Sequence, residues 1–145
     1  MEPDTATGSG QPVVVTNLEV AAHETFDRVV LTLGGNGRAG WLAEYVEQAL
    51  AQGSGDPVEV GGDATLEVTL TNIAYPTDAP ADAYDGPDRM RARNTQAIVE
   101  VVYGTTFEGQ TQLWVGTTQR LPFRVFALQD PDRVVVDVVQ PESPA

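Results

Sequence analysis

Cysteine and lysine are both absent from this 145-residue chain, and histidine occurs only once, at His23. The lack of cysteine excludes disulfides, thiolate metal ligands and cysteine nucleophiles. All eight basic residues are arginines, and they face 21 acidic residues, for a formal net charge of -13. This charge repels phosphate backbones and anionic lipid surfaces, so we expect no nucleic acid as a partner and no unaided binding to a membrane surface.

Long apolar runs are missing as well. No stretch approaches the ~20 residues of a membrane span, and Met1–Asp4 has neither the basic start nor the apolar stretch of a signal peptide. Residues 1–12 are rich in Gly, Ser, Thr and Pro, so we expect a flexible leader there, and a flexible tail over residues 140–145. A Met placed directly on such a leader is consistent with a chain trimmed of its export signal. One domain is expected over residues 13–139.

The tetrapeptide Asp-Arg-Val-Val is present twice, at residues 27–30 and 132–135, and each copy opens a β-branched run. A turn-forming Asp followed by Val is typical of the start of a strand. Because the copies lie near the two ends of the chain, we expect a closed all-β domain. Period-two alternation predicts strands over 13–21, 26–33, 64–72, 96–103, 110–117, 121–128 and 133–139. Runs of this length and spacing predict a small antiparallel β-sandwich of about 7–9 strands, with two long loops at 49–62 and 74–94.

The segment that follows Gly40 fits two kinds of structure. Leu42, Tyr45 and Val46 begin an apolar series with the spacing of an amphipathic helix. Trp41, Ala43 and Tyr45 also alternate with their neighbours as a strand would. Periodicity alone favours the helix.

Several short pieces of sequence occur in a specific order and spacing. They are Phe26-Asp27-Arg28-Val29-Val30, Gly40-Trp41 with Glu44-Tyr45-Val46, Gly53-Ser54-Gly55-Asp56-Pro57-Val58, Tyr84-Asp85-Gly86-Pro87, Val101-Val102-Tyr103-Gly104 leading to Thr106-Phe107-Glu108-Gly109-Gln110-Thr111-Gln112, Pro122-Phe123-Arg124-Val125-Phe126, and Asp130-Pro131-Asp132-Arg133-Val134-Val135-Val136-Asp137. In these pieces the chain resembles the AMIN-like domains of actinobacterial exported proteins and lipoproteins, distant relatives of the AMIN domain of cell-wall amidases and secretins. The resemblance covers nearly everything from Val13 to Val139.

This resemblance implies a small β-sandwich placed outside the cytoplasm, where the better-known AMIN domains hold partner enzymes at the envelope by binding peptidoglycan. It also implies a strand, not a helix, from Gly40 to about Val46. No catalytic residues come with the family, so the resemblance assigns none to this chain.

The sequence contains no clear pattern of residues for catalysis or metal binding. His23 lies in a predicted turn, where we expect a solvated side chain without a metal. A pair of carboxylates as in a glycosidase is conceivable among Glu100, Glu108, Asp130, Asp132 and Asp137, but with 21 acids some pair always lies close. The acidic loop of Asp78, Asp82, Asp85 and Asp88 departs from the EF-hand spacing, so a plain acidic loop is favoured over a Ca²⁺ site. We therefore expect no enzyme activity, no cofactor and no metal.

Aromatic residues with polar neighbours are the best candidates for binding. Tyr103, Phe107 and Trp114 flank a predicted hairpin turn, with Gln110 and Gln112 beside them. A planar ring offers a rigid contact for a sugar face, and amides bind hydroxyls from the side. The alternative is that Tyr103 and Trp114 fill the core of the sandwich.

Arg124 is the remaining candidate, either as a contact for a carboxylate ligand or as a neutralising partner for acidic neighbours. Together the candidates predict a non-enzymatic, extracytoplasmic binding module of the cell envelope, lipid-anchored if a lipidation cysteine precedes this chain. The predicted partner is cell-wall glycan or peptidoglycan, bound by the Tyr103–Trp114 region. The alternative is a protein–protein interaction domain for an envelope partner. The oligomeric state is left open by the sequence.

Overall fold

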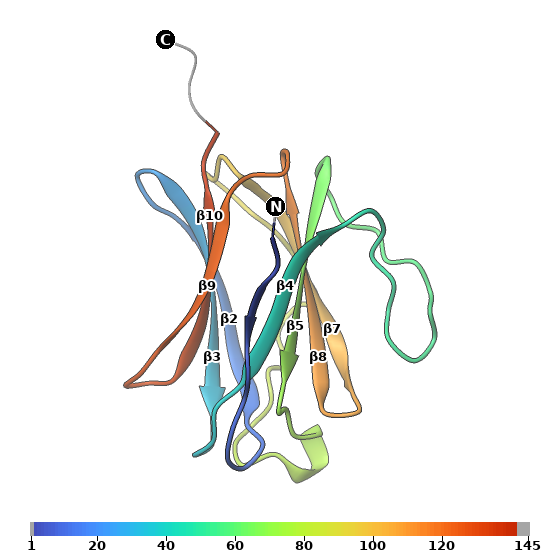
Figure 1. Cartoon of the computed structure of the whole chain (residues 1–145), viewed down its shortest axis with the longest axis vertical. Helices are drawn as coiled ribbons and strands as arrows, with labels where there is room; N and C mark the ends of the chain where they lie inside the picture. The colour runs from blue at the N-terminus through green and yellow to red at the C-terminus, as the bar shows by residue number, and fades with distance from the viewer. Residues whose placement is uncertain (1, 142–145) are drawn as a thin grey trace.

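Ten strands in two antiparallel sheets make up the described part of the chain, residues 2–141, in a computed structural model (Figure 1). The strands are β1 Asp4–Ala6, β2 Val14–Ala22, β3 Phe26–Gly34, β4 Gly40–Val46, β5 Ala64–Thr71, β6 Arg89–Arg91, β7 Ile98–Phe107, β8 Gln110–Thr117, β9 Phe123–Leu128 and β10 Arg133–Val139, with one short 3-10 turn, η1 Pro76–Asp78. No helix of the described residues is long and apolar enough to cross a membrane.

The two sheets face each other as a sandwich, which confirms the predicted all-β class. One sheet has six strands in the order β1-β4-β5-β8-β7-β6, and the other has four in the order β2-β3-β10-β9. The strand number exceeds the expected range because two short strands of three residues each, β1 and β6, were not foreseen. Both lie at edges of the larger sheet, where three residues of pairing suffice to extend it.

The core lies between the sheets and follows from the alternation of side chains along each strand. Leu66, Val68 and Leu70 of β5 are fully buried, as are Leu113 and Val115 of the neighbouring β8. Residues two apart point to the same face of a strand, so these apolar series all meet the opposite sheet. The duplicated tetrapeptide supplies the centre of that opposite sheet, because its two copies begin the adjacent antiparallel strands β3 and β10.

The segment Gly40–Val46 is the strand β4, so the helix favoured by periodicity is wrong and the strand implied by family resemblance is confirmed. It pairs with β5 along its whole length, and Ala43 is completely buried on the inner face. Leu42, which the helical pattern would have buried, is 40% exposed. Pairing on both sides, with β1 and β5, satisfies the backbone groups of this segment and outweighs its helical spacing.

The expected flexible leader is partly structured, which corrects that expectation for Asp4–Ala6. These residues form β1 on the free edge of β4, and the Asp4 carboxylate accepts hydrogen bonds from the Trp41 indole (3.1 Å) and from the Val125 amide (2.9 Å). Asp4 therefore joins the six-stranded sheet to β9 of the other sheet. Most of the predicted tail, residues 142–145, lies outside the described residues, but its first residue, Gln140, donates hydrogen bonds to His23 and Asp27.

Two long loops cover parts of this framework (Figure 1). The loop between β4 and β5 lies against the outer face of the six-stranded sheet, where Ala49 packs against Trp114. The loop between β5 and β7 holds η1 and β6, and part of it runs beside β2, because the Tyr84 amide donates to the Val15 carbonyl (2.8 Å). These two loops decide which parts of the sheets remain accessible.

Candidate functional site

The six residues that the sequence singled out for binding lie in three separate places. Four of them, Phe107, Gln110, Gln112 and Trp114, are associated with the outer face of the six-stranded sheet and its covering loop. Arg124 lies on the outer face of the four-stranded sheet, and Tyr103 lines a cavity at the open side of the sandwich. They do not form a single site.

Trp114 is buried, with 2% of its surface exposed. It forms a small second apolar cluster with Ala49 and Val102, and its indole N–H donates to the Glu67 carboxylate (2.9 Å). The core alternative considered for Trp114 is thus the observed one, although the ring lies on the outer face of the sheet and not between the sheets. No open ring face is left there for a sugar to stack on.

The amides of Gln110 and Gln112 hold the covering loop onto the sheet. Gln112 accepts a hydrogen bond from the Gln52 backbone N–H (2.8 Å) and donates to the Leu50 carbonyl (3.1 Å). Gln110 accepts from the side-chain amide of Gln52 (2.6 Å). Phe107 remains 40% exposed, and its ring lies against Gly53 of the same loop. The Gln112 amide and the Gln110 carbonyl are therefore engaged with the loop.

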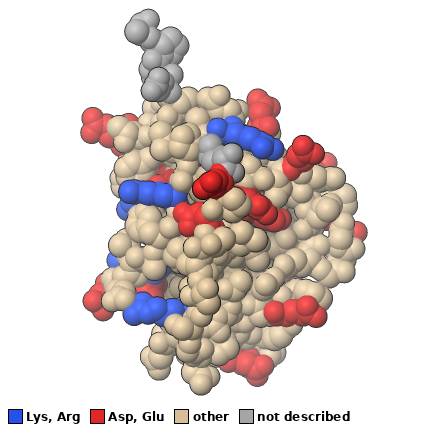
Figure 2. All heavy atoms as spheres, viewed as in Figure 1, with Lys and Arg blue, Asp and Glu red and all other residues tan. Residues whose placement is uncertain are grey.

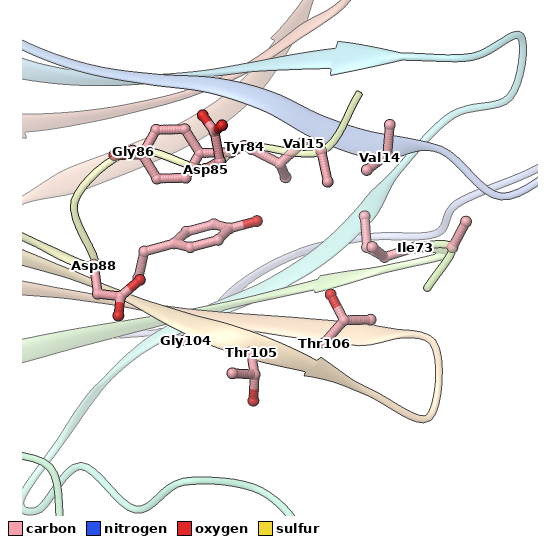
Figure 3. Close-up of a pocket in the computed structure, with 13 residues that line it drawn as sticks. Val14, Val15, Ile73, Tyr84, Asp85, Gly86, Asp88, Gly104, Thr105 and Thr106 are labelled. Atoms are coloured by element: carbon pink, nitrogen blue, oxygen red, sulfur yellow. The ribbon is translucent and has the colours of Figure 1, made fainter. Parts of the chain in front are cut away.

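Tyr103 lines a cavity between the two sheets. The cavity has a volume of about 260 Å³ and is lined by β2 residues Val14 and Val15, by β7 from Tyr103 to Thr106, and by the loop from Ala83 to Asp88 (Figure 3). In this view the loop segment with Tyr84 and Gly86 faces β7 across the opening. The site is built by loop and strand together.

Three hydrogen bonds position the loop that forms this wall. The Tyr84 amide donates to the Val15 carbonyl (2.8 Å), and the Tyr103 amide donates to the Asp88 carbonyl (2.7 Å). Within the loop, the Tyr84 hydroxyl donates to the Pro87 carbonyl (2.8 Å). The loop is thus tied to both sheets, to β2 on one side and β7 on the other.

The two tyrosine rings of the cavity contact each other edge to face. Their centroids are 5.2 Å apart and their planes are inclined by 80°, a favourable geometry for an aromatic pair. Burial, together with the nearby Tyr84, raises the pKa of Tyr103 to about 12. Burial also raises the pKa of Tyr84, with further contributions from the carboxylates of Asp88 and Asp85. Both phenols are therefore protonated at neutral pH.

The rim of the cavity is polar. Asp85, Asp88 and Thr105 are exposed, and Thr106 also lines the cavity. Carboxylates accept and hydroxyls donate or accept, so this rim offers hydrogen-bonding groups around an aromatic centre. We call the cavity with Tyr84, Asp85, Asp88 and Tyr103 the tyrosine pocket.

A comparison with protein families matches residues 13–140 to the AMIN-like domain. The chain belongs to the AMIN-like domain family. Comparisons with curated proteins and with solved structures found no match. The matched part of this AMIN-like domain includes both sheets apart from β1, which precedes it. The resemblance seen in the sequence is thereby confirmed over nearly the whole chain.

Sequence reasoning missed Tyr84 as a site residue of this AMIN-like domain. Asp85 and Asp88 were considered only as members of an acidic loop, because nothing in the local pattern says that the loop folds back onto β2. The available signal was the Tyr84-Asp85-Gly86-Pro87 piece, an aromatic residue in a turn-forming segment. Within residues 2–141 no group of three or more His, Asp or Glu side chains is arranged to hold a metal ion.

Proposed function

We propose that this AMIN-like domain is a non-enzymatic, extracytoplasmic binding module that associates with cell-wall glycan through the tyrosine pocket. The observation that carries the proposal is the edge-to-face pair of Tyr84 and Tyr103 beside the carboxylates of Asp85 and Asp88. A sugar ring presents an apolar face edged by hydroxyls. Aromatic carbons pack against such a face, while carboxylates accept hydrogen bonds from the hydroxyls.

The charge of the pocket selects among wall polymers. Two carboxylates at the rim, in a chain of net charge -13, repel anionic polymers and leave neutral, hydroxyl-rich glycan as the favoured ligand. The volume of about 260 Å³ lies below the ~300–1,000 Å³ typical of pockets that enclose whole ligands. The pocket therefore suits one ring or one end of a glycan chain.

A binding role without catalysis is supported by the composition of the pocket and by the family. His23 stacks on Phe26 of β3 and does not line the pocket. Resemblance to the AMIN family implies placement at the envelope, and the proposal adopts that location for the full-length protein. This location is tested by measuring how the full-length protein distributes between wall, membrane and cytoplasmic fractions.

The binding test is co-sedimentation of the purified domain with purified wall material. We expect the domain to sediment with the wall, and we expect muramidase digestion of the wall to release it. Tyr84→Ala should reduce the bound fraction, whereas Tyr84→Phe, which keeps the ring, should retain most of it. Tyr75→Ala, at a tyrosine that does not line the pocket, is the matched control.

Three results decide between the candidate partners. Binding that survives muramidase digestion would favour the alternative of an envelope protein partner. Equal losses in Tyr84→Ala and Tyr75→Ala would remove the tyrosine pocket from the proposal. Retention of the domain by wall material that depends on Tyr84 supports both the ligand class and the site.

A further inference from the structure

A second polar cluster lies on the outer face of the four-stranded sheet and joins three of its strands. Arg28 of β3 donates to both oxygens of Asp137 of β10, at 2.7 and 3.0 Å, and Arg124 of β9 donates to one of them at 3.1 and 3.2 Å. The Asp137 side chain is 2% exposed, whereas that of Arg124 is 66% exposed. Two cations share one carboxylate, so the cluster carries an excess positive charge.

Aromatic rings hold these guanidinium groups in place. Arg28 and Arg124 lie over the ring of Phe126, with distances of 5.5 and 5.0 Å to its centroid. Arg28 also lies over the ring of Phe26, at 5.2 Å. Cation–π contacts on one side and the buried carboxylate on the other restrict both side chains, which reduces the entropy lost when an anion binds.

A groove of about 270 Å³ adjoins the cluster. Arg124 and Asp137 form its polar part, and Phe26, Phe123 and Val139 form much of its apolar part. Val139 is 45% exposed although it is apolar, so the groove presents an uncovered hydrophobic surface beside an uncompensated cation. On the face drawn in Figure 2, most of the basic side chains in view lie along the side occupied by the four-stranded sheet.

We propose that this groove binds an extended peptide segment of a partner protein, one that carries a carboxylate side chain next to an apolar side chain. Charge complementarity argues for this occupant. The excess charge at Arg28, Arg124 and Asp137 matches a single carboxylate, whereas a polyanion would meet the repulsion of the chain as a whole, at -13. A groove of this size receives one or two side chains and leaves no room for a folded domain.

The experiment is a titration of the isotopically labelled domain, followed by the NMR signals of the arginine Nε–H groups and the backbone amides. The probe is a capped tripeptide of leucine, glutamate and phenylalanine, and its control is the same peptide with glutamine in place of glutamate. We expect saturable shifts at Arg124 and Phe26 with the glutamate peptide. The glutamine peptide should bind at least about tenfold more weakly, the lower end of the loss expected for one hydrogen bond to a charged group.

Protein variants separate this charge from the charge of the whole chain. Arg124→Gln keeps hydrogen-bond donors but removes the cation, and we expect it to weaken binding of the glutamate peptide at least about tenfold. Arg91→Gln, at an exposed residue of β6 in the other sheet, changes the net charge by the same amount and should leave the affinity unchanged. Tyr84→Ala should also leave it unchanged, which keeps this test independent of glycan binding.

Equal binding of the two peptides, or shifts that never saturate, would overturn the proposal. So would an equal loss of affinity in Arg124→Gln and Arg91→Gln, because binding would then depend on overall charge and not on the groove. Shifts centred on the tyrosine pocket would place the peptide elsewhere and would overturn it as well.

Discussion

The guanidinium of Arg28 donates hydrogen bonds to both oxygens of the Asp137 carboxylate, across 109 positions of sequence. This pair connects the two central strands of the four-stranded sheet, β3 and β10, at directly paired positions. The hydrogen bonds to Asp137 raise the pKa of Arg28. Arg133, in the second copy of the tetrapeptide, donates instead to the backbone carbonyls of Pro131 and Gln129. The two copies of the tetrapeptide therefore differ, since Arg28 pairs with a carboxylate and Arg133 binds backbone carbonyls.

Arg28→Ala should therefore destabilise the domain more than Arg133→Ala does. Removal of Arg28 leaves the buried Asp137 with only the more exposed Arg124, and breaking a buried ion pair costs up to about 3–5 kcal/mol. Because Arg124 remains, we expect a loss of about 2–3 kcal/mol in the free energy of unfolding. Urea denaturation of both variants measures it, and a loss in Arg133→Ala as large as in Arg28→Ala would contradict the structural difference between the two copies.

Trp114→Ala should lower stability by about 3–5 kcal/mol, the usual cost of removing a buried large aromatic side chain. The physical reason is that Trp114 packs in one cluster with Ala49 of the covering loop, against which Val58 and Val60 of the same loop also pack. Limited proteolysis should then cut within residues 50–60 faster than in the wild-type domain. Leu42→Ala, at a side chain that is 40% exposed, is the control and should cost much less. A fully stable Trp114→Ala variant would show that this cluster does not hold the loop.

Deprotonation of Tyr103 should lower the free energy of unfolding at alkaline pH. Its pKa in the folded domain is about 12, against ~10 for an unperturbed tyrosine. The folded state therefore binds more protons than the unfolded state between these values, so the contribution of Tyr103 is intact below pH ~10 and is lost as pH rises toward ~12. Tyr103→Phe removes this loss, and its stability relative to wild type should increase over that window in denaturation curves. A constant difference between the two proteins from pH ~7 to ~11 would contradict the raised pKa.

Gly86→Ala should disturb the tyrosine pocket without unfolding the domain. A Cβ at position 86 would lie 2.6 Å from atoms of the Tyr84 ring and hydroxyl, so that ring has to move. Because a side-chain end moves more easily than backbone, we expect a small change in melting temperature and a clear loss of wall binding in co-sedimentation. Gly61→Ala, whose added Cβ would make only ordinary contacts of 3.4–3.5 Å, is the matched control. Full wall binding by Gly86→Ala would argue against stacking on Tyr84.

The strands with clean alternation could be predicted from the sequence because their burial is a local property. Leu66, Val68 and Leu70 are spaced two apart, and a strand places such residues on one face whatever the rest of the chain does. The Asp-Arg-Val-Val copies begin strands for the same reason. Gly40–Val46 could not be assigned by periodicity, since its apolar residues fit both periods and only pairing with β1 and β5 decides between them.

The candidate site depended on the tertiary structure. Gln112 and Trp114 are candidate ligand contacts by sequence, but the loop that covers them comes from residues 60 or more positions earlier. Tyr84 becomes a pocket residue only because its loop bonds to Val15 on the other sheet. The sequence by itself determined the all-β fold and the family, since the first follows from local alternation and the second from the order of short motifs along the chain. Only the tertiary structure decided which aromatic rings are buried and which are exposed, because that depends on where loops distant in sequence pack against the sheets.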